Sequence, residues 1–242
     1  MKEKAGICCK KKRASLLFRS ECRIFVTMDW INVHTHKPGI GVNIVDPCLG
    51  EVQVPEQGKV YYSKGIHPLF IDGEAEKKIQ EIEAVAADRK IVAIGEAGLD
   101  RNSETGIERQ MELFEQEAAI AARFDLPLII HVVKAIPELI TVYKKCKEPG
   151  KWIIHGFNNR RELLQELLRH GFYISAGRHV MNRESPVYRL LPEVPRERLL
   201  LETDNSDYTI EEIYRQVAEC RNERAEELQQ YVQLNFERLF RI

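Results

Sequence analysis

Short apolar runs of strand character alternate with segments of helical periodicity from residue 29 to the end of the chain. We expect eight strands, at residues 30–36, 41–46, 59–68, 90–98, 126–133, 151–157, 172–177 and 198–204. Most of these runs are apolar on both faces, which is typical of buried parallel strands. Strands that alternate with helices favour an α/β fold with right-handed crossovers. Eight of them predict a (β/α)8 TIM barrel.

The first two connections between strands are too short or too irregular for the helix that usually follows each barrel strand. Only about four residues separate the first two predicted strands. The second connection, residues 47–58, holds two prolines and two glycines, which interrupt helices. The sequence therefore predicts a trimmed barrel in which the first two helices are missing.

Three capping-box patterns mark where later helices should begin. Each places a Thr or Asn three residues before a Glu: Thr105 with Glu108, Asn159 with Glu162, and Thr209 with Glu212. We expect the last helical region to break near Asn222.

The chain divides into a basic extension, residues 1–27, and one barrel domain, residues 28–242. The extension carries eight Lys or Arg against two Glu, and we interpret it as disordered or not native to the protein. A nucleic-acid or membrane-surface arm is the alternative interpretation. The remainder carries a net charge of -7, so it is no basic nucleic-acid wrapper.

Cysteine usage and hydropathy indicate the compartment. The six cysteines form no C-x-x-C pair, which favours reduced thiols and a cytoplasmic location. No apolar run reaches the roughly 18–20 residues of a membrane span, so we expect no membrane partner.

Residues suited to metal chemistry stand at the ends of five predicted strands. In a strand, residues two apart share a side, so His34 and His36 can both face the barrel axis. Active sites of barrels lie at the rim where the carboxyl ends of the strands gather. The candidate ligands are His34, His36, Glu96, His131, His155 and Asp204.

Each of these signals is weak alone. The H-x-H pair could be incidental, His131 or His155 could be a satisfied core residue, and Asp204 could cap the following helix. The same placement on five strands favours a joint site. Imidazole and carboxylate ligands suit Zn²⁺, Mn²⁺ or Fe²⁺, with Mg²⁺ less favoured by so many histidines.

The motifs "INVHTH", "GIHP", "AIGEAGLD", "LPLIIHVVKA", "IIHGF" and "LLLETD" occur in an order that resembles the TatD-family metal-dependent hydrolases, within the amidohydrolase-like barrels. The resemblance spans about residues 30–240. It implies a (β/α)8 barrel and a divalent-metal phosphodiesterase, often a deoxyribonuclease, including 3′-to-5′ exonucleases.

Carried over by position, the resemblance implies a centre of two divalent metal ions (Zn, Mn or Mg). His34, His36 and Asp204 would hold one ion, His131 and His155 the other, and Glu96 would bridge them. It also places His67 near the substrate, although a structural role before Pro68 is an equal alternative.

The chain departs from the family where substrate would be recognised. "HVVKA" stands where an Arg commonly follows the fifth-strand His, so Lys134 could meet a phosphate only as a point charge. "GFNNR" and "ETDNSDY" also differ from the usual stretches. These changes make nuclease activity less secure than metal-dependent hydrolysis.

The function that we predict is hydrolysis of DNA or another phosphodiester, with Asp204 as general base and Glu96 as bridging carboxylate. Lys134, His67 and Arg178 are candidate phosphate contacts, and Asp100 is expected to orient a ligand histidine. We assign His170 and His179 no functional role. The alternatives are a metal-dependent amidase or lactonase on the same barrel, or a non-catalytic barrel. The oligomeric state stays open, a monomer included.

Overall fold

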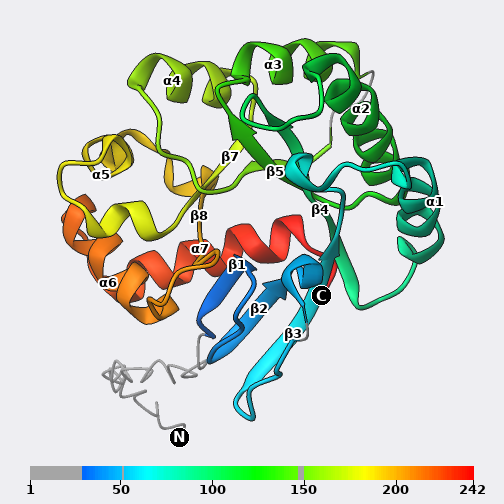
Figure 1. The fold of residues 1–242 in the computed structure, drawn as a ribbon. Coiled ribbons are helices and arrows are strands. Elements are labelled where there is room, and N and C mark those ends of the chain that lie inside the picture. Colours follow the sequence, from blue (N-terminus) through cyan, green and yellow to red (C-terminus); the bar gives the residue numbers. More distant parts are fainter. Residues whose placement is uncertain (1–28, 51, 147–149) are drawn as a thin grey trace, which may run out of the picture.

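The computed structural model describes residues 29–50, 52–146 and 150–242, so the predicted extension at residues 1–27 lies outside the described residues. One sheet holds eight strands, each pairing in parallel with the next along the chain (Figure 1). These are β1 (Ile31–Thr35), β2 (Gly41–Val45), β3 (Gly58–Lys64), β4 (Ile91–Asp100), β5 (Leu128–Val133), β6 (Trp152–Ile154), β7 (Tyr173–Ala176) and β8 (Leu199–Leu201). Every predicted strand range overlaps its strand, and the predicted α/β barrel is confirmed.

The ends of β1 and β8 are joined by backbone contacts of the segments that carry His34, His36 and Asp204. Thr35 and Asp204 form a parallel bridge. The Asp204 N–H donates to the His34 carbonyl at 3.1 Å, and the His36 N–H donates to the Asp204 carbonyl at 3.2 Å. These bonds close the sheet into a barrel and fix the first and last strands against each other.

Helices surround the strands from β3 onward (Figure 1). The α-helices are α1 (Ala75–Val85), α2 (Ile107–Phe124), α3 (Ile136–Lys145), α4 (Arg161–Arg169), α5 (Pro186–Leu190), α6 (Ile210–Arg221) and α7 (Ala225–Leu239). Short 3-10 helices are η1 (Pro47–Leu49), η2 (Pro68–Phe70), η3 (Arg178–Met181), η4 (Leu191–Glu193) and η5 (Arg196–Arg198).

The first two crossover helices are missing, as predicted. Residues 36–40 return from β1 to β2 without any helix, and η1 is the only helical element among the described residues between β2 and β3. The Asn43 side chain holds the short first return in place. Its Oδ1 accepts the Gly39 N–H at 3.1 Å, and its Nδ2 donates to the Gly39 carbonyl at 2.8 Å.

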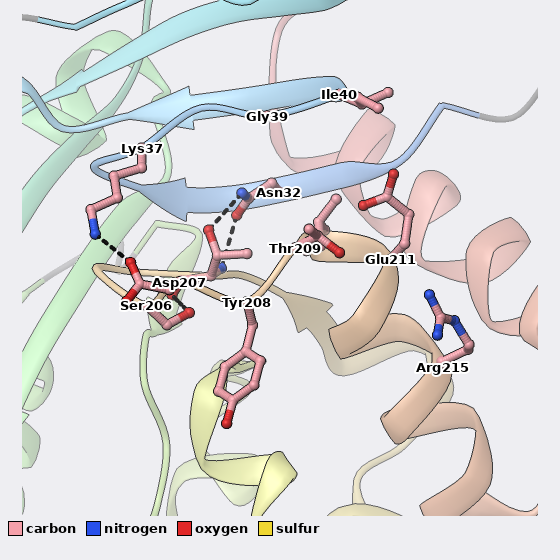
Figure 2. Close-up of a pocket in the computed structure, with 12 residues that line it drawn as sticks. Asn32, Lys37, Gly39, Ile40, Ser206, Asp207, Tyr208, Thr209, Glu211 and Arg215 are labelled. Atoms are coloured by element: carbon pink, nitrogen blue, oxygen red, sulfur yellow. Dashed lines mark hydrogen bonds and ion pairs between the residues drawn. The ribbon is translucent and has the colours of Figure 1, made fainter.

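A groove of about 540 Å³ lies between this short return and the start of α6 (Figure 2). Asn32 lines it, and its Nδ2 donates to Thr203 Oγ1 at 2.9 Å. At the rim, the Lys37 ammonium and the Asp207 carboxylate form an ion pair of 2.8 Å.

Helices α6 and α7 cover the outer side of β1 and β8, and the Tyr214 hydroxyl donates to the Ile31 carbonyl at 3.2 Å. The two C-terminal helices thus pack against the first and last strands of the barrel.

One of the three predicted capping boxes forms. Thr209 and Glu212 cap α6 reciprocally, and α6 ends at Asn222 in a left-handed conformation, as expected. The prediction for Thr105 is wrong, because α2 begins after Gly106 and the Gln110 side chain donates to the Thr105 carbonyl instead. The prediction for Asn159 is also wrong. The residue that precedes α4 is Arg160, and no side chain caps that helix.

We expect Gly41→Ala to lower the free energy of unfolding by about 2–4 kcal/mol. Gly41 has a φ of 92°, and a Cβ there would overlap the Trp30 carbonyl oxygen, which the short return brings against it. Urea denaturation measures the loss. Gly39→Ala is the matched control, because nothing lies within 4 Å of a Cβ at Gly39. Equal stability of the two variants would contradict this account of the first return.

Candidate metal centre

A single buried carboxylate stands at the centre of the candidate site. Glu96 comes from β4 and is 3% exposed. Its Oε1 lies 2.9 Å from His131 Nδ1 and 2.9 Å from His155 Nε2. Its Oε2 lies 3.2 Å from His34 Nε2 and 3.6 Å from His36 Nε2. The two oxygens of one carboxylate therefore face two different pairs of imidazoles.

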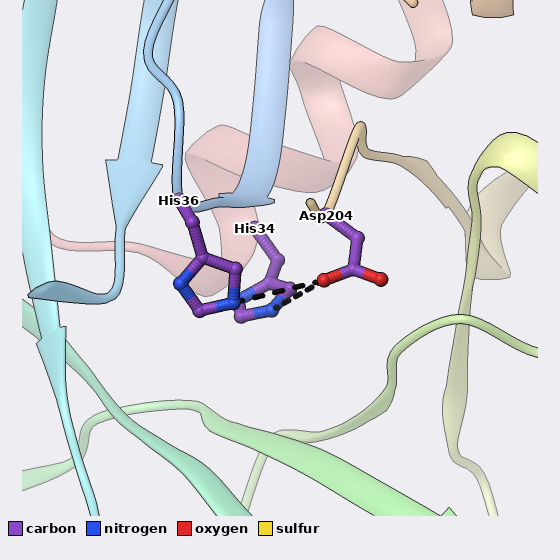
Figure 3. A group of neighbouring side chains, drawn as sticks. All are labelled: His34, His36 and Asp204. Atoms are coloured by element: carbon purple, nitrogen blue, oxygen red, sulfur yellow. Dashed lines mark ion pairs between the residues drawn. The ribbon is translucent and has the colours of Figure 1, made fainter. Parts of the chain in front are cut away.

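Asp204 completes the first pair (Figure 3). Its Oδ1 lies 3.8 Å from His34 Nε2 and 3.7 Å from His36 Nε2. These three side chains can hold a metal ion, and so can the group of His34, Glu96 and His155. All six predicted ligands thus lie together at the carboxyl ends of the strands. Their role as ligands stays a prediction.

The rings of His36, His131 and His155 share one arrangement: one nitrogen faces the cluster and the other faces an oxygen behind it. His36 Nδ1 lies 2.9 Å from the Asp46 carbonyl oxygen, and His131 Nε2 lies 3.0 Å from Asp100 Oδ2. His155 Nδ1 lies 3.4 Å from Glu202 Oε1, an ion-pair contact that is not a hydrogen bond. Metal-ligating histidines show this pattern, because the oxygen behind fixes the tautomer that leaves a lone pair toward the metal.

His34 provides a second test of whether a metal fits here. It is 0% exposed, yet neither of its ring nitrogens makes a hydrogen bond within the described residues. A buried polar group without a partner is costly. Nε2 lies 3.2 Å from Glu96 Oε2 without a hydrogen bond, and a cation bound there would satisfy both atoms, so the residues present fit a divalent metal.

His67 contacts the same cluster with the opposite tautomer. Its Nε2 lies 3.1 Å from Glu96 Oε1, and its Nδ1 accepts the Leu69 N–H at 3.0 Å. Since Nδ1 is an acceptor, the neutral ring carries its proton on Nε2 and donates it to Glu96. His67 therefore caps η2, as the structural alternative predicted, and it also contacts the cluster, while its place near the substrate stays a prediction. It orients Glu96 rather than offering a lone pair.

The cluster shifts the pKa values of its members. Burial raises the pKa of Glu96, but His155, His131 and His34 together bring it well below the usual value. Burial opposes protonation of His36, yet its contacts with Cys48, Glu96 and the Asp46 carbonyl raise its pKa to about 10. Without metal, this site therefore holds protons, and binding of a metal would release them.

The oxygens behind the histidines include two residues that the sequence analysis missed. Asp46 accepts the Glu96 N–H through Oδ2 at 2.9 Å, and Glu202 accepts the Gly156 N–H through Oε1 at 2.7 Å. The signal for each was its place at the end of a predicted strand, the same signal that found the ligands. Asp100 was predicted to orient a ligand histidine and lies against His131.

Lys134 and Arg178 lie at the rim and not in the cluster. The Lys134 ammonium contacts Asn102 Oδ1 at 3.3 Å. A cavity of about 160 Å³ opens onto the cluster, and Arg178, His179 and Asp204 are among the residues that line it. Their contact with substrate stays a prediction.

Within the described residues, none of the helices has the length and apolar character needed to cross a membrane.

The fold and this cluster define a TIM-barrel protein with a candidate metal centre at its rim. The family model for TatD-related DNases matches residues 48–241, and the chain belongs to this family. Because the match begins after His34 and His36, the place of that pair in the site rests on the structure.

Two relatives and one solved structure illustrate the similarity. A Bacillus subtilis protein described as the uncharacterized metal-dependent hydrolase YabD is 31% identical, over 78% of this chain and 80% of that protein. A 3′-5′ ssDNA/RNA exonuclease TatD from Edwardsiella piscicida is 30% identical, over 74% of this chain and 76% of that protein. The crystal structure of YjjV, a TatD homologue from Escherichia coli, is 25% identical with a TM-score of 0.67, and covers 76% of this chain and 77% of that one.

We predict that Glu202→Gln weakens binding of Mn²⁺ about 10–100-fold. The amide keeps an oxygen for the Gly156 N–H but removes the negative charge that faces His155 Nδ1. Calorimetric titration of the metal-free protein measures the affinity. Glu227→Gln on the surface of α7 is the control, and equal affinities in both variants would contradict a role for Glu202 behind the site.

A further carboxyl lies behind the loop that carries His67. Glu117 on α2 is 1% exposed, and its Oε1 accepts the Ile66 N–H at 2.7 Å. Burial, with a smaller contribution from Asp46, raises its pKa from 4.5 to about 8. The sequence analysis missed it, although it stands three residues after Phe114 on the buried face of α2.

This pKa predicts a stability difference that depends on pH. The folded state keeps the Glu117 proton that the unfolded state loses near pH 4.5, so stability falls as the pH rises from about 4.5 to about 8. Glu117→Gln should match the wild type at pH 4.5 and be more stable by about 4 kcal/mol above pH 8. Urea denaturation across this range, with the exposed Glu112→Gln as control, tests it. A difference that does not change with pH would contradict it.

Proposed function

We propose that this protein is a phosphodiesterase that holds two divalent metal ions and hydrolyses DNA or a related phosphodiester. The observation that carries the proposal is the division of Glu96. One oxygen faces His34 and His36, and the other faces His131 and His155, as a carboxylate shared by two ions requires. The family match and the exonuclease name of one relative favour a phosphodiester substrate.

The residues would divide between two ions. His34, His36 and Asp204 would hold the first, His131 and His155 would hold the second, and Glu96 would contribute to both. Two such ions would polarise a phosphoryl oxygen and make water a nucleophile near neutral pH. The imidazole and carboxylate donors suit Zn²⁺ and Mn²⁺, and Mg²⁺ remains an outcome for the assay to test.

Asp204 is the residue best placed to move a proton. Both oxygens of Glu96 face histidines, which leaves that carboxylate no free acceptor. Asp204 turns only Oδ1 toward His34 and His36, and its second oxygen points away from them (Figure 3). Its side chain is 21% exposed and lines the cavity that opens onto the cluster. It would take the proton of the attacking water.

Chelation followed by reconstitution with Mn²⁺, Mg²⁺ or Zn²⁺ tests this function on single-stranded DNA, RNA and bis(p-nitrophenyl) phosphate. We expect about two equivalents of bound metal and activity that chelation abolishes. Asp204→Asn should lower kcat at least about 100-fold. His131→Ala should lose bound metal as well as activity.

Lys144→Ala is the control, because Lys144 is exposed in the last turn of α3. Less than one equivalent of metal after metal-replete purification would rule out the two-metal centre. Equal hydrolysis by the wild type and both site variants would show that the reaction occurs elsewhere.

A further inference from the structure

A polar groove leads from the metal centre across the ends of β5, β6 and β7. Its inner part is the cavity of about 160 Å³ that Asp204 and Glu202 line. Its outer part is a cavity of about 280 Å³ that reaches Lys134 and Asn158. Both cavities are lined by His155 and His179, among other shared residues, so they adjoin each other, and we treat them together as the groove. His179 stands where the two parts join.

The side chain of Asn158 is held so that it can only donate into the groove. Its Oδ1 accepts the Val187 N–H, from the first turn of α5, at 3.3 Å. This bond identifies the oxygen, so the amide nitrogen is the atom left for the groove. Among the described residues, no acceptor bonds to that nitrogen. Asn158 therefore offers two N–H donors at a fixed place.

The ring of His179 is also available to a ligand in the groove. Its backbone is fixed, because its carbonyl accepts the Ser185 hydroxyl at 2.7 Å and the Asn182 N–H at 3.2 Å. Within the part of the chain that the structure describes, no group bonds to its ring nitrogens. Burial, and then the charge of Arg178, lower the pKa of His179. At neutral pH it is an uncharged ring with one N–H to donate.

Lys134 supplies the positive charge of the outer part. It adopts a left-handed conformation, with a φ of 54°, directly after β5. Its ammonium contacts the neutral Asn102 Oδ1, and no carboxylate of the described residues forms an ion pair with it. No Asp or Glu lines the outer cavity. A surface that carries one positive charge and several N–H donors without carboxylates suits an anion.

We propose that the outer part of the groove binds a second phosphate of the substrate, next to the phosphate that is cleaved. Asn158 and His179 are the specificity-determining residues, and Lys134 is the countercharge. The inference rests on the proposed phosphodiesterase function. The cleaved phosphate must lie at the cluster, which the inner cavity reaches, so the outer donors are left for a neighbouring phosphate.

Thymidine dinucleotides with no terminal phosphate, with a 5′-phosphate or with a 3′-phosphate test the proposal. We expect one phosphorylated form to be hydrolysed with a kcat/KM about tenfold higher than the plain dinucleotide. The two phosphorylated forms reveal on which side of the cleaved bond the second phosphate lies. This preference ratio compares substrates on one enzyme, so partial loss of folding leaves it unchanged.

Asn158→Asp is the sharpest variant, because Asp keeps the acceptor for the Val187 N–H and replaces the donor with a negative charge. It should reduce the preference to about one or reverse it, whereas a purely structural role would leave it intact. His179→Ala and Lys134→Met should each reduce the preference several-fold. Lys144→Met, a matched lysine on the surface of α3, should keep it.

Equal kcat/KM for all three dinucleotides in the wild type would overturn the second-phosphate site. So would a wild-type preference in Asn158→Asp and His179→Ala. Hydrolysis of bis(p-nitrophenyl) phosphate, which has no second phosphate, reports the proposed function separately. If that diester is cleaved and the preference is absent, this inference alone fails; if no diester is cleaved, both fail.

Discussion

Glu96 carries a negative charge into the barrel interior, where no Lys or Arg of the described residues pairs with it and five imidazoles surround it. A buried carboxylate is costly unless its oxygens are satisfied. Here β1, β5 and β6 and the loop before η2 supply the imidazoles, and Asp46 accepts the Glu96 N–H. The ends of β1, β5 and β6 therefore converge on this charge at one rim of the barrel.

The barrel positions this centre without helices after β1 and β2, because side-chain hydrogen bonds hold the first connection and the first strand in place. Asn43 ties the first return to β2, and Asn32 joins β1 to Thr203 after β8. Side-chain amides can do this since each offers both donors and acceptors at a fixed distance from the backbone. The first and last strands therefore keep their alignment, on which the approach of His34 and His36 to Asp204 depends.

Much of the fold and the candidate ligands could be predicted from the sequence, because both follow from periodicity. Strand ends in a parallel barrel share one rim, so His131 and Asp204 could be placed together without coordinates. Glu117 could not, since its importance lies in which backbone N–H it accepts, that of Ile66. The capping pattern at Asn159 failed for a similar reason. A capping pattern shows only that the residue types are suitable for a cap. In the structure, α4 begins after Arg160, and Asn159 lines the outer cavity.

The two sides of the barrel rim differ in loop length and in charge, and this difference affects how a substrate can be recognised. After β1 and β2 the connections are short. At this side of the rim Lys37 and Asp207 form an ion pair, so together they carry no net charge. Beside β5 to β7 the loops form a groove whose outer part is lined by N–H donors and by no carboxylate of the described residues. Fixed N–H donors without protein partners can orient a flexible phosphodiester. The two metals would then define where the bond is cleaved, while the loops after β5 and β6 define which part of the chain lies beside it.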